Sequence, residues 1–416
     1  MNTYLKELSK QMQHMKRFYD SLRLINIHKA LANTNKKEEG KETMKTSKFR
    51  LSILYIGLAV LLLFGSVSPA TATINATHNV NIDEIQNLLD QYFQLRYESR
   101  KNNVIPDLSR FVAVNSERAN KFLSTETNKL RLETLHVNIN DLEYLDYKFT
   151  IDIQSVDVKS EDRTVTVIIL ENHEVVFKKT PHIVSKMNNL IHQIVLSPDG
   201  QFWKIIDDTY DDYLWRAIRQ TSIEFIESQV NTPQSIPFAS YPATQQNKVG
   251  GGGYDRSNAV QFARDWYNST YPGFYRFSAD CTNFVSQAIN VGGFIPQTAT
   301  APGVNIGWYY VNSSQYANAW TFTPAFYDFV VNGHWWVGGP EGVVTVIEQL
   351  LPGDVILYDI RTGSYTFDHA VIVVEMTDLG NQELFPLVAG HSPDVNDYPF
   401  TAFNYYKTYP IQIIGY

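Results

Sequence analysis

The sequence predicts an α+β protein built from two domains. Residues 83–100 place apolar side chains at helical spacing, and the chain that follows alternates apolar and polar residues in strand fashion up to residue 206. Residues 229–253 contain three prolines, four consecutive glycines and one charged residue, a composition typical of a linker. Helical spacing followed by strands then recurs in residues 254–416. Each half therefore predicts helices packed on an antiparallel sheet.

The first feature along the chain is an export signal. Residues 44–50 are basic, residues 51–65 are almost entirely apolar, and Ala70-Thr71-Ala72 follows at the distance expected of a cleavage site. Residues 44–72 therefore predict a secretory signal peptide, and an uncleaved signal anchor is the alternative. Residues 1–43 form a polar extension, so either Met44 is the true start or the extension stays cytoplasmic. We expect a secreted or cell-envelope protein with no integral membrane domain after cleavage.

Residues 82–228 predict a small α+β domain. The helix comes first, and the strand-like segments after it include the turn Leu196-Ser197-Pro198-Asp199-Gly200-Gln201, whose Asp-Gly pair is typical of a hairpin. This order resembles domains of the cystatin or NTF2 kind, in fold alone. His173, His182 and His192 lie among its strand-like residues and are expected to be surface or packing residues. The role of the domain is left open.

Charge and cysteine content exclude several classes of function. The chain has a formal net charge of −8, and residues 73–416 hold 23 Lys and Arg against 38 Asp and Glu. Nucleic acid is therefore not expected as a partner, because phosphates attract the opposite sign. The chain has one cysteine, Cys281, so it can form no internal disulfide and no cysteine-rich metal site. No metal and no cofactor are expected, and the oligomeric state is left open.

Cys281 is predicted to begin a helix. Asp280 is a plausible N-cap, apolar residues recur at helical spacing after it, and Gly292-Gly293 predicts the end of the helix. The first turn of a helix favours a thiolate over a thiol, through the helix dipole and the free N–H groups. A buried structural cysteine is the competing interpretation. For a nucleophilic cysteine, the backbone N–H of Cys281 is the expected oxyanion donor, and the second donor is left open.

Two histidines are predicted to meet near one end of a hairpin. Residues 254–416 contain only His334, His369 and His391. His369 opens a strand and His391 ends the next, so a turn at Gly380-Asn381 places His369 opposite residue 391 or 392. One imidazole could then act as a base while the other orients it. His334 is expected to pack or to line a groove.

These residues resemble a known family, the cysteine amidases of Gram-positive bacteria with the signature D-C-T-N-F-V-S-Q. The family is a branch of the NlpC/CHAP-like, papain-like superfamily. The resemblance covers about 160 residues of the C-terminal half. Its motifs are Tyr254-Asp255-Arg256, Asp280 to Gln287, Gly292-Gly293, Pro352 to Ile356, Asp368 to Val373 and Gly390-His391-Ser392. Ala279 and Ala288 stand where the family often has Gly and a second Cys.

The resemblance implies a thiol hydrolase that cleaves amide or peptide bonds, usually in the cell envelope. By position it implies Cys281 as the nucleophile and His369 as the general base and acid. His391 is then the third, orienting residue, and Asp394 is the alternative for that role. Its fold would be a papain-like domain in which the helix of the cysteine packs on an antiparallel sheet. The substrate would be a cell-envelope peptide or amide.

Two other functions fit the same residues. The domain could keep the fold and serve as a catalytically silent module that binds cell wall or protein. Alternatively, the same Cys-His pair could transfer the acyl group to an amine instead of water, which would make the protein an acyltransferase.

Overall fold

A computed structural model describes most of the chain beyond residue 79. The described residues are 80–113, 116–159, 161, 163–210, 212, 218, 253–298, 307–333, 338–359, 367–380, 383–403 and 407–416. The predicted extension, signal peptide and linker (except Gly253) lie outside the described residues, as do His334 and three of the seven tryptophans. Among the helices that are described, none is long and apolar enough to cross a membrane.

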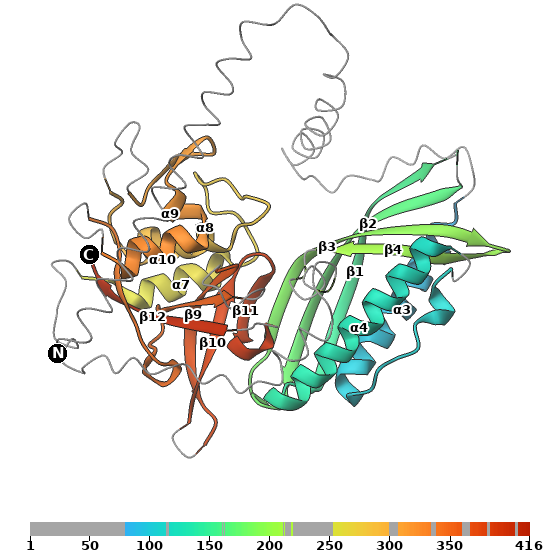
Figure 1. The fold of residues 1–416 in the computed structure, drawn as a ribbon, viewed down its shortest axis with the longest axis horizontal. Coiled ribbons are helices and arrows are strands. Elements are labelled where there is room, and N and C mark those ends of the chain that lie inside the picture. The colour runs from blue at the N-terminus through green and yellow to red at the C-terminus, as the bar shows by residue number, and fades with distance from the viewer. Residues whose placement is uncertain are drawn as a thin grey trace, which may run out of the picture. The chain divides into compact units, whose positions relative to one another are not determined.

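The N-terminal domain packs two helices against an antiparallel sheet (Figure 1). Its helices are α3 (Ile82–Asn102) and α4 (Glu117–Asn140), and its strands are β1 (Tyr144–Lys159), β2 (Thr164–Phe177), β3 (Ser185–Asp199) and β4 (Phe202–Tyr210). The Asn81 side chain caps α3 at the Asp83 N–H, and Ser116 caps α4 at the Ala119 N–H. Gly200 takes the positive φ that the predicted Asp-Gly turn requires. The α+β prediction is thus confirmed for this half.

The C-terminal domain places its longer helices before most of its strands. Its helices are α7 (Arg256–Trp266), α8 (Cys281–Gln287), α9 (Asn318–Thr321) and α10 (Thr323–Val331). Its main strands are β7 (Glu341–Val344), β8 (Val355–Asp359), β9 (His369–Asp378), β10 (Leu384–Gly390), β11 (Asp394–Pro399) and β12 (Lys407–Gly415). Short elements complete it: β5 (Tyr310–Asn312), β6 (Gln315–Tyr316), the π-turn after α8 (Ala288–Gly292), and the 3₁₀ turns η5 (Ile347–Gln349) and η6 (Phe400–Ala402). The α+β prediction is confirmed here too.

One antiparallel sheet runs through both domains. Its strand order is β1-β2-β3-β11-β10-β9-β8-β12-β7, with β4 beside β3. The C-terminal half of β3 pairs with β4, and its first residues pair with β11, where Asp394 lies opposite Asn188 and Val395 opposite Met187. The strand that follows the candidate catalytic histidines is therefore held by the N-terminal domain.

The hairpin of β9 and β10 has the predicted register, but it ends early. Val388 pairs with Val373 and Ala389 with Ile372, as a turn at Gly380-Asn381 predicts. Beyond Ala389, β10 turns to β11, where Gly390 pairs with Val395. The predicted cross-strand meeting of His369 and His391 is therefore not formed.

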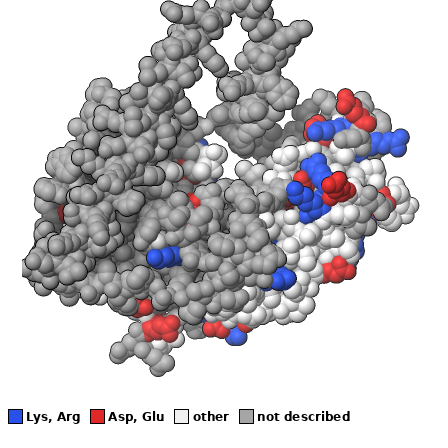
Figure 2. All heavy atoms as spheres, in the orientation of Figure 1, with Lys and Arg blue, Asp and Glu red and all other residues white. Residues whose placement is uncertain are grey.

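Charges of both signs are intermingled on the described surface of the N-terminal domain (Figure 2). On this face the described Lys and Arg side chains lie among Asp and Glu side chains instead of forming a stripe of one sign. The described part of this face therefore has no basic patch that would suit a polyanion.

Candidate active site

Cys281 lies at the first position of α8, in the interior of the protein. All seven residues of α8 are buried, and the helix packs against β9 and β10. The Cys281 Sγ lies 3.8 Å from the Thr282 hydroxyl and 4.0 Å from the Thr323 hydroxyl, and these two hydroxyls are 2.7 Å apart. The backbone N–H of Ala370 also donates to the thiol. Thus α8, α10 and β9 together surround the sulfur.

The electrostatic balance at Cys281 differs from the prediction. Burial raises the pKa of the Cys281 thiol, and this effect outweighs the hydrogen bonds from Thr282, Ala370 and Thr323, which lower it. The helix start was expected to favour thiolate, but the low-polarity surroundings dominate. The resting group is therefore a neutral thiol at neutral pH, and its attack on a carbonyl requires a base.

His369 opens β9 directly before Ala370. Its ring is fully buried and packs against the rings of Tyr358 and Phe403, at centroid distances of 5.8 and 5.1 Å. Ala370 packs instead in the cluster of α8 and α10, and successive side chains of a strand point to opposite faces. The Cys281 sulfur therefore lies against the β9 backbone next to His369. The His369 imidazole projects from the opposite face of the strand. No hydrogen bond joins these two described side chains.

His391 contacts the loop before Cys281 and not His369. Its Nδ1 lies 2.6 Å from Asp280 Oδ2, its Nε2 lies 3.0 Å from the Trp266 carbonyl oxygen, and its ring stacks on Phe284 at 4.1 Å. Both partners are acceptors, so a neutral ring can satisfy one of them and an imidazolium both. The expected hydrogen bond between the two imidazoles is thus replaced by a buried carboxylate–imidazole pair beside Cys281.

Asp280 organises the turn that presents Cys281. It occupies the predicted N-cap position, but its side chain makes no capping hydrogen bond. Its Oδ1 instead accepts from the Phe277 N–H and from Asn283 Nδ2, both at 2.8 Å, while Oδ2 faces His391. The cap interpretation is therefore wrong for the side chain. The residue was proposed as a cap because Asp before a helix usually has that role.

Asp394 has partners on both sides of the domain boundary. Its Oδ1 forms an ion pair with Arg276, in the loop that leads to Cys281, and its Oδ2 accepts from Asn189 Nδ2 at 2.9 Å. Neither oxygen faces an imidazole. The structure therefore places Asp394 as a support of the Cys281 loop.

The Tyr254 and Arg256 motif meets the Gly353-Asp354 turn. The Tyr254 hydroxyl donates to the Gly353 carbonyl at 2.6 Å, and Arg256 Nη1 lies 2.6 Å from Asp354 Oδ1. Asp354 is fully buried and also accepts from the Ile413 N–H. These contacts fix α7 to β8 and β12, so both motifs have a structural role.

Three polar contributors were not anticipated from the sequence. The hydroxyls of Thr282 and Thr323 face the sulfur, and Asn189 reaches the site from the N-terminal domain. Thr282 could have been suspected because it adjoins the cysteine. Thr323 and Asn189 are distant in sequence and carry no recognisable pattern. No group of three described His, Cys, Asp or Glu side chains is arranged to hold a metal ion.

Comparison with known proteins indicates an amidase-like class for this domain. Residues 253–414 match a family described as "Putative amidase domain", so the C-terminal domain is amidase-like and the match suggests hydrolysis of amide bonds. The chain is also 38% identical over 132 residues to the Bacillus subtilis (strain 168) protein described as "Uncharacterized protein YhbB". That alignment covers 32% of this chain and 40% of the relative. No solved structure matches.

Proposed function

We propose that this protein is an exported thiol amidase or peptidase that hydrolyses an amide bond in cell-envelope peptide, with Cys281 as its nucleophile. The observation that supports this most is the position of the sulfur. Cys281 begins a buried helix inside the amidase-like region, and its Sγ lies at the N–H of Ala370, the residue after His369. Export is inferred from residues 44–72.

The proposed reaction proceeds through an acyl-enzyme. Cys281 Sγ attacks the scissile carbonyl carbon while its proton passes to His369, and the C–N bond then breaks as the amine takes that proton. Water adds to the thioester, releases the acid and restores the thiol. The backbone N–H of Cys281, among the first of α8, stabilises the oxyanion. Since the thiol is neutral at rest, proton transfer accompanies attack.

For this transfer the His369 imidazole must move from the opposite face of β9 to the sulfur, because no hydrogen bond joins the two side chains in the described structure. This movement is part of the proposal, and the His369→Ala variant tests it. His391 acts as a positioning residue that holds the Cys281 turn through Asp280. Asp394 holds the same turn through Arg276.

The test is product analysis with matched variants. The mature chain and its Cys281→Ala, His369→Ala and His182→Ala variants are incubated with cell-wall fragments, and the products are identified by mass spectrometry. Cys281→Ala should abolish product, and His369→Ala should slow its formation by about 10²–10⁴. His182→Ala, at an exposed position of the N-terminal domain, should behave like the parent. Full activity of either active-site variant would refute the assignment.

A second function is favoured by the buried, neutral thiol and its lack of a hydrogen bond to His369. The domain would then be a silent module that binds wall fragments without cleaving them. A silent module should bind wall fragments without forming any new product, and Cys281→Ala should leave this binding unchanged. Including a free amine in the assay distinguishes an acyltransferase, since an amine adduct would then replace the acid.

A further inference from the structure

A hollow lies away from Cys281, where the N-terminal domain meets the β11 segment. Its cavity volume is about 100 Å³, between α3, α4 and strands β2 to β4 on one side and the chain after His391 on the other. A single water needs about 10–15 Å³ of such space, so the hollow has room for a ligand of several heavy atoms. Its charged lining residues are Arg96, Arg100, Lys129, Glu133, Glu171 and Asp212.

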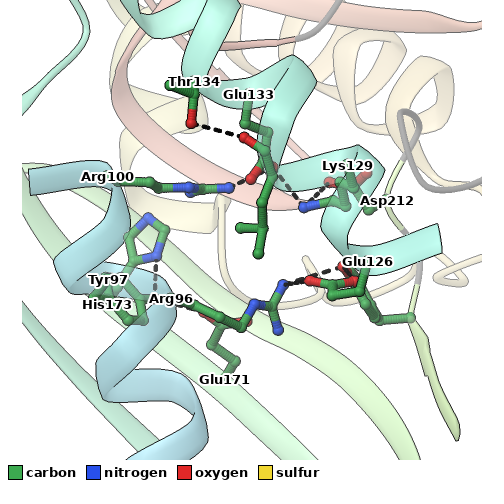
Figure 3. Close-up of polar contacts among 12 residues, drawn as sticks. Arg96, Tyr97, Arg100, Glu126, Lys129, Glu133, Thr134, Glu171, His173 and Asp212 are labelled. Atoms are coloured by element: carbon green, nitrogen blue, oxygen red, sulfur yellow. Dashed lines mark hydrogen bonds and ion pairs between the residues drawn. The ribbon is translucent and has the colours of Figure 1, made fainter. Parts of the chain in front are cut away.

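Glu133 offers this hollow an unused acceptor. Its Oε1 is shared by Lys129 Nζ at 2.5 Å and Arg100 Nη2 at 2.6 Å, as Figure 3 shows. Burial would raise the pKa of Glu133, but Arg100 and Lys129 outweigh it and lower this pKa to about 2, so the group is a carboxylate. Its Oε2 is buried and has no hydrogen-bond partner. A buried charged oxygen without a donor is costly, which points to a donor that comes from a ligand.

Arg96 offers an unused donor in the same hollow. Its guanidinium turns towards Glu126 (Figure 3), with Nη2 3.2 Å from Glu126 Oε1 and 3.1 Å from the Tyr210 hydroxyl. Its Nη1 forms an ion pair with Asp208 Oδ2 at 3.7 Å, but neither atom has a hydrogen-bond partner, and the Arg96 side chain is 91% buried. A guanidinium N–H in this state suits a carboxylate or carbonyl oxygen.

The lining carries no excess of either charge. Three cations, Arg96, Arg100 and Lys129, face three carboxylates, Glu133, Glu171 and Asp212. A ligand that adds one net charge would leave that charge uncompensated, whereas a zwitterion would not. The remaining wall includes apolar side chains, which are Met187, Leu190, Val395 and Phe403.

We propose that this hollow binds a short peptide with free ends, placing its terminal carboxylate at Arg96 and its terminal ammonium at Glu133. The peptide's apolar side chains contact Leu190 and Phe403. One wall comes from each domain, so the bound peptide bridges them. The binding does not depend on the chemistry of Cys281, so it stands or fails separately from the proposed hydrolysis.

The first experiment compares three probes on one protein. Calorimetric titration of the mature Cys281→Ala chain, which excludes turnover, uses L-alanyl-L-leucine, its N-acetyl form and its C-terminal amide. The free dipeptide should bind, and each blocked form should bind about tenfold or more weakly, because each lacks one charge-assisted hydrogen bond. Absence of binding by the free dipeptide, or equal binding of all three, overturns the proposal.

Variants then locate the site. Glu133→Gln keeps the shape but removes the charge, so it should weaken the free dipeptide about tenfold and leave the N-acetyl form little changed. Leu190→Trp fills the hollow without touching the charges and should abolish binding. Arg118→Gln removes an ion pair with Asp207 outside the hollow and should bind like the parent. If both Glu133→Gln and Leu190→Trp bind the free dipeptide like the parent, the proposed location is refuted. If Glu133→Gln fails to fold, Leu190→Trp and the three probes still test the proposal.

Discussion

The protonation of Cys281 is the residue-scale property that the proposed chemistry depends on. Because burial raises the pKa of this thiol, its alkylation by iodoacetamide at pH 7 should be slower than that of a free thiol. The rate should keep rising with pH beyond the ordinary thiol pKa of about 8.5. An alkylation rate that is already at its plateau near pH 7 would instead indicate a preformed thiolate. Unfolded protein in denaturant gives the matched reference rate.

The raised pKa of Cys281 also makes the stability of the fold depend on pH. The folded state holds the Cys281 proton more tightly than the unfolded chain does, so the unfolded chain loses it first as pH rises. The contribution of this group to the free energy of unfolding is therefore complete below pH about 8.5 and decreases above it. Cys281→Ala should remove this decrease in urea unfolding measured at pH 7 and pH 9.5.

The His391 and Asp280 pair gives the second residue-scale prediction. His391→Phe keeps the stacking on Phe284 but deletes the bond to Asp280 at 2.6 Å and the bond to Trp266. We expect a loss of about 1–3 kcal/mol in the free energy of unfolding, because a buried carboxylate oxygen loses its donor. Urea denaturation measures it, and His182→Phe, at an exposed position, is the control. Unchanged stability would show that Asp280 finds other donors.

Part of the site could be predicted at this scale. Cys281 could be proposed as the nucleophile because a signature surrounds it and a helix begins there, and His369 could be proposed as its base because it opens a strand. The partners of His391 and Asp394 could not be predicted. The hydrogen bond of His391 to Asp280, for example, joins residues 111 positions apart and leaves no local pattern. The thiol's pKa shift was also missed, because burial by distant elements outweighs the local dipole.

At the scale of the element, the end of the Cys281 helix is set by packing. Gly292-Gly293 was predicted as a helix stop, which usually relies on a left-handed glycine, but neither residue has a positive φ. A Cβ on Gly292 would lie 2.7 Å from Phe262 Cβ and 2.8 Å from the Ala259 Cα of α7. The glycine therefore allows α7 to approach the helical segment that begins at Cys281.

This close approach predicts the effect of one added methyl group. Gly292→Ala should reduce the free energy of unfolding by about 1–3 kcal/mol, because backbone atoms of α7 must move. Gly380→Ala is an unsuitable control, since its φ is positive, whereas Gly253→Ala adds a Cβ with nothing within 4 Å. Chemical denaturation of the two variants gives the comparison. Equal stabilities would mean that α7 can shift without cost.

The N-terminal helices illustrate why one element was predicted and another was missed. Helix α3 was visible because its buried positions are mainly apolar. Helix α4 was not, because its buried face includes Glu126, Lys129, Glu133 and His136, which break the apolar periodicity. The same residues line or adjoin the charged hollow. An irregular pattern in the sequence thus coincided with the candidate binding site.

At the scale of the whole molecule, the two predicted domains share one sheet. The linker composition predicted two domains, and the structure joins them: β3 pairs with β11, and side chains of the two domains hydrogen-bond. This pairing was beyond prediction because Asp394, Asn396 and Asn188 are polar and give no strand signal on their own. The Asn189 bond to Asp394 then links the N-terminal domain to the loop that presents Cys281.

Separating the domains should therefore destabilise the amidase-like one. Residues 253–416 alone would expose the β11 edge and lose the ladder to β3. They would also lose the hydrogen bond between the Tyr398 hydroxyl and His173, and the one from the Ser185 hydroxyl to the Asp397 carbonyl. At about 1 kcal/mol for each of at least three hydrogen bonds, the melting temperature should fall by about 6–12 °C. The exposed edge should also promote self-association, because unpaired strand edges pair with other chains.

Light scattering measures the self-association, and thermal melts measure the stability, of the fragment and of the mature chain. Lys186→Ala in the mature chain is the control, since it removes an exposed ion pair at 3.4 Å on β3 and should cost under about 1 kcal/mol. A monomeric fragment with an unchanged melting temperature would mean that the shared sheet adds little to stability, and that the N-terminal domain influences the site only through bound peptide.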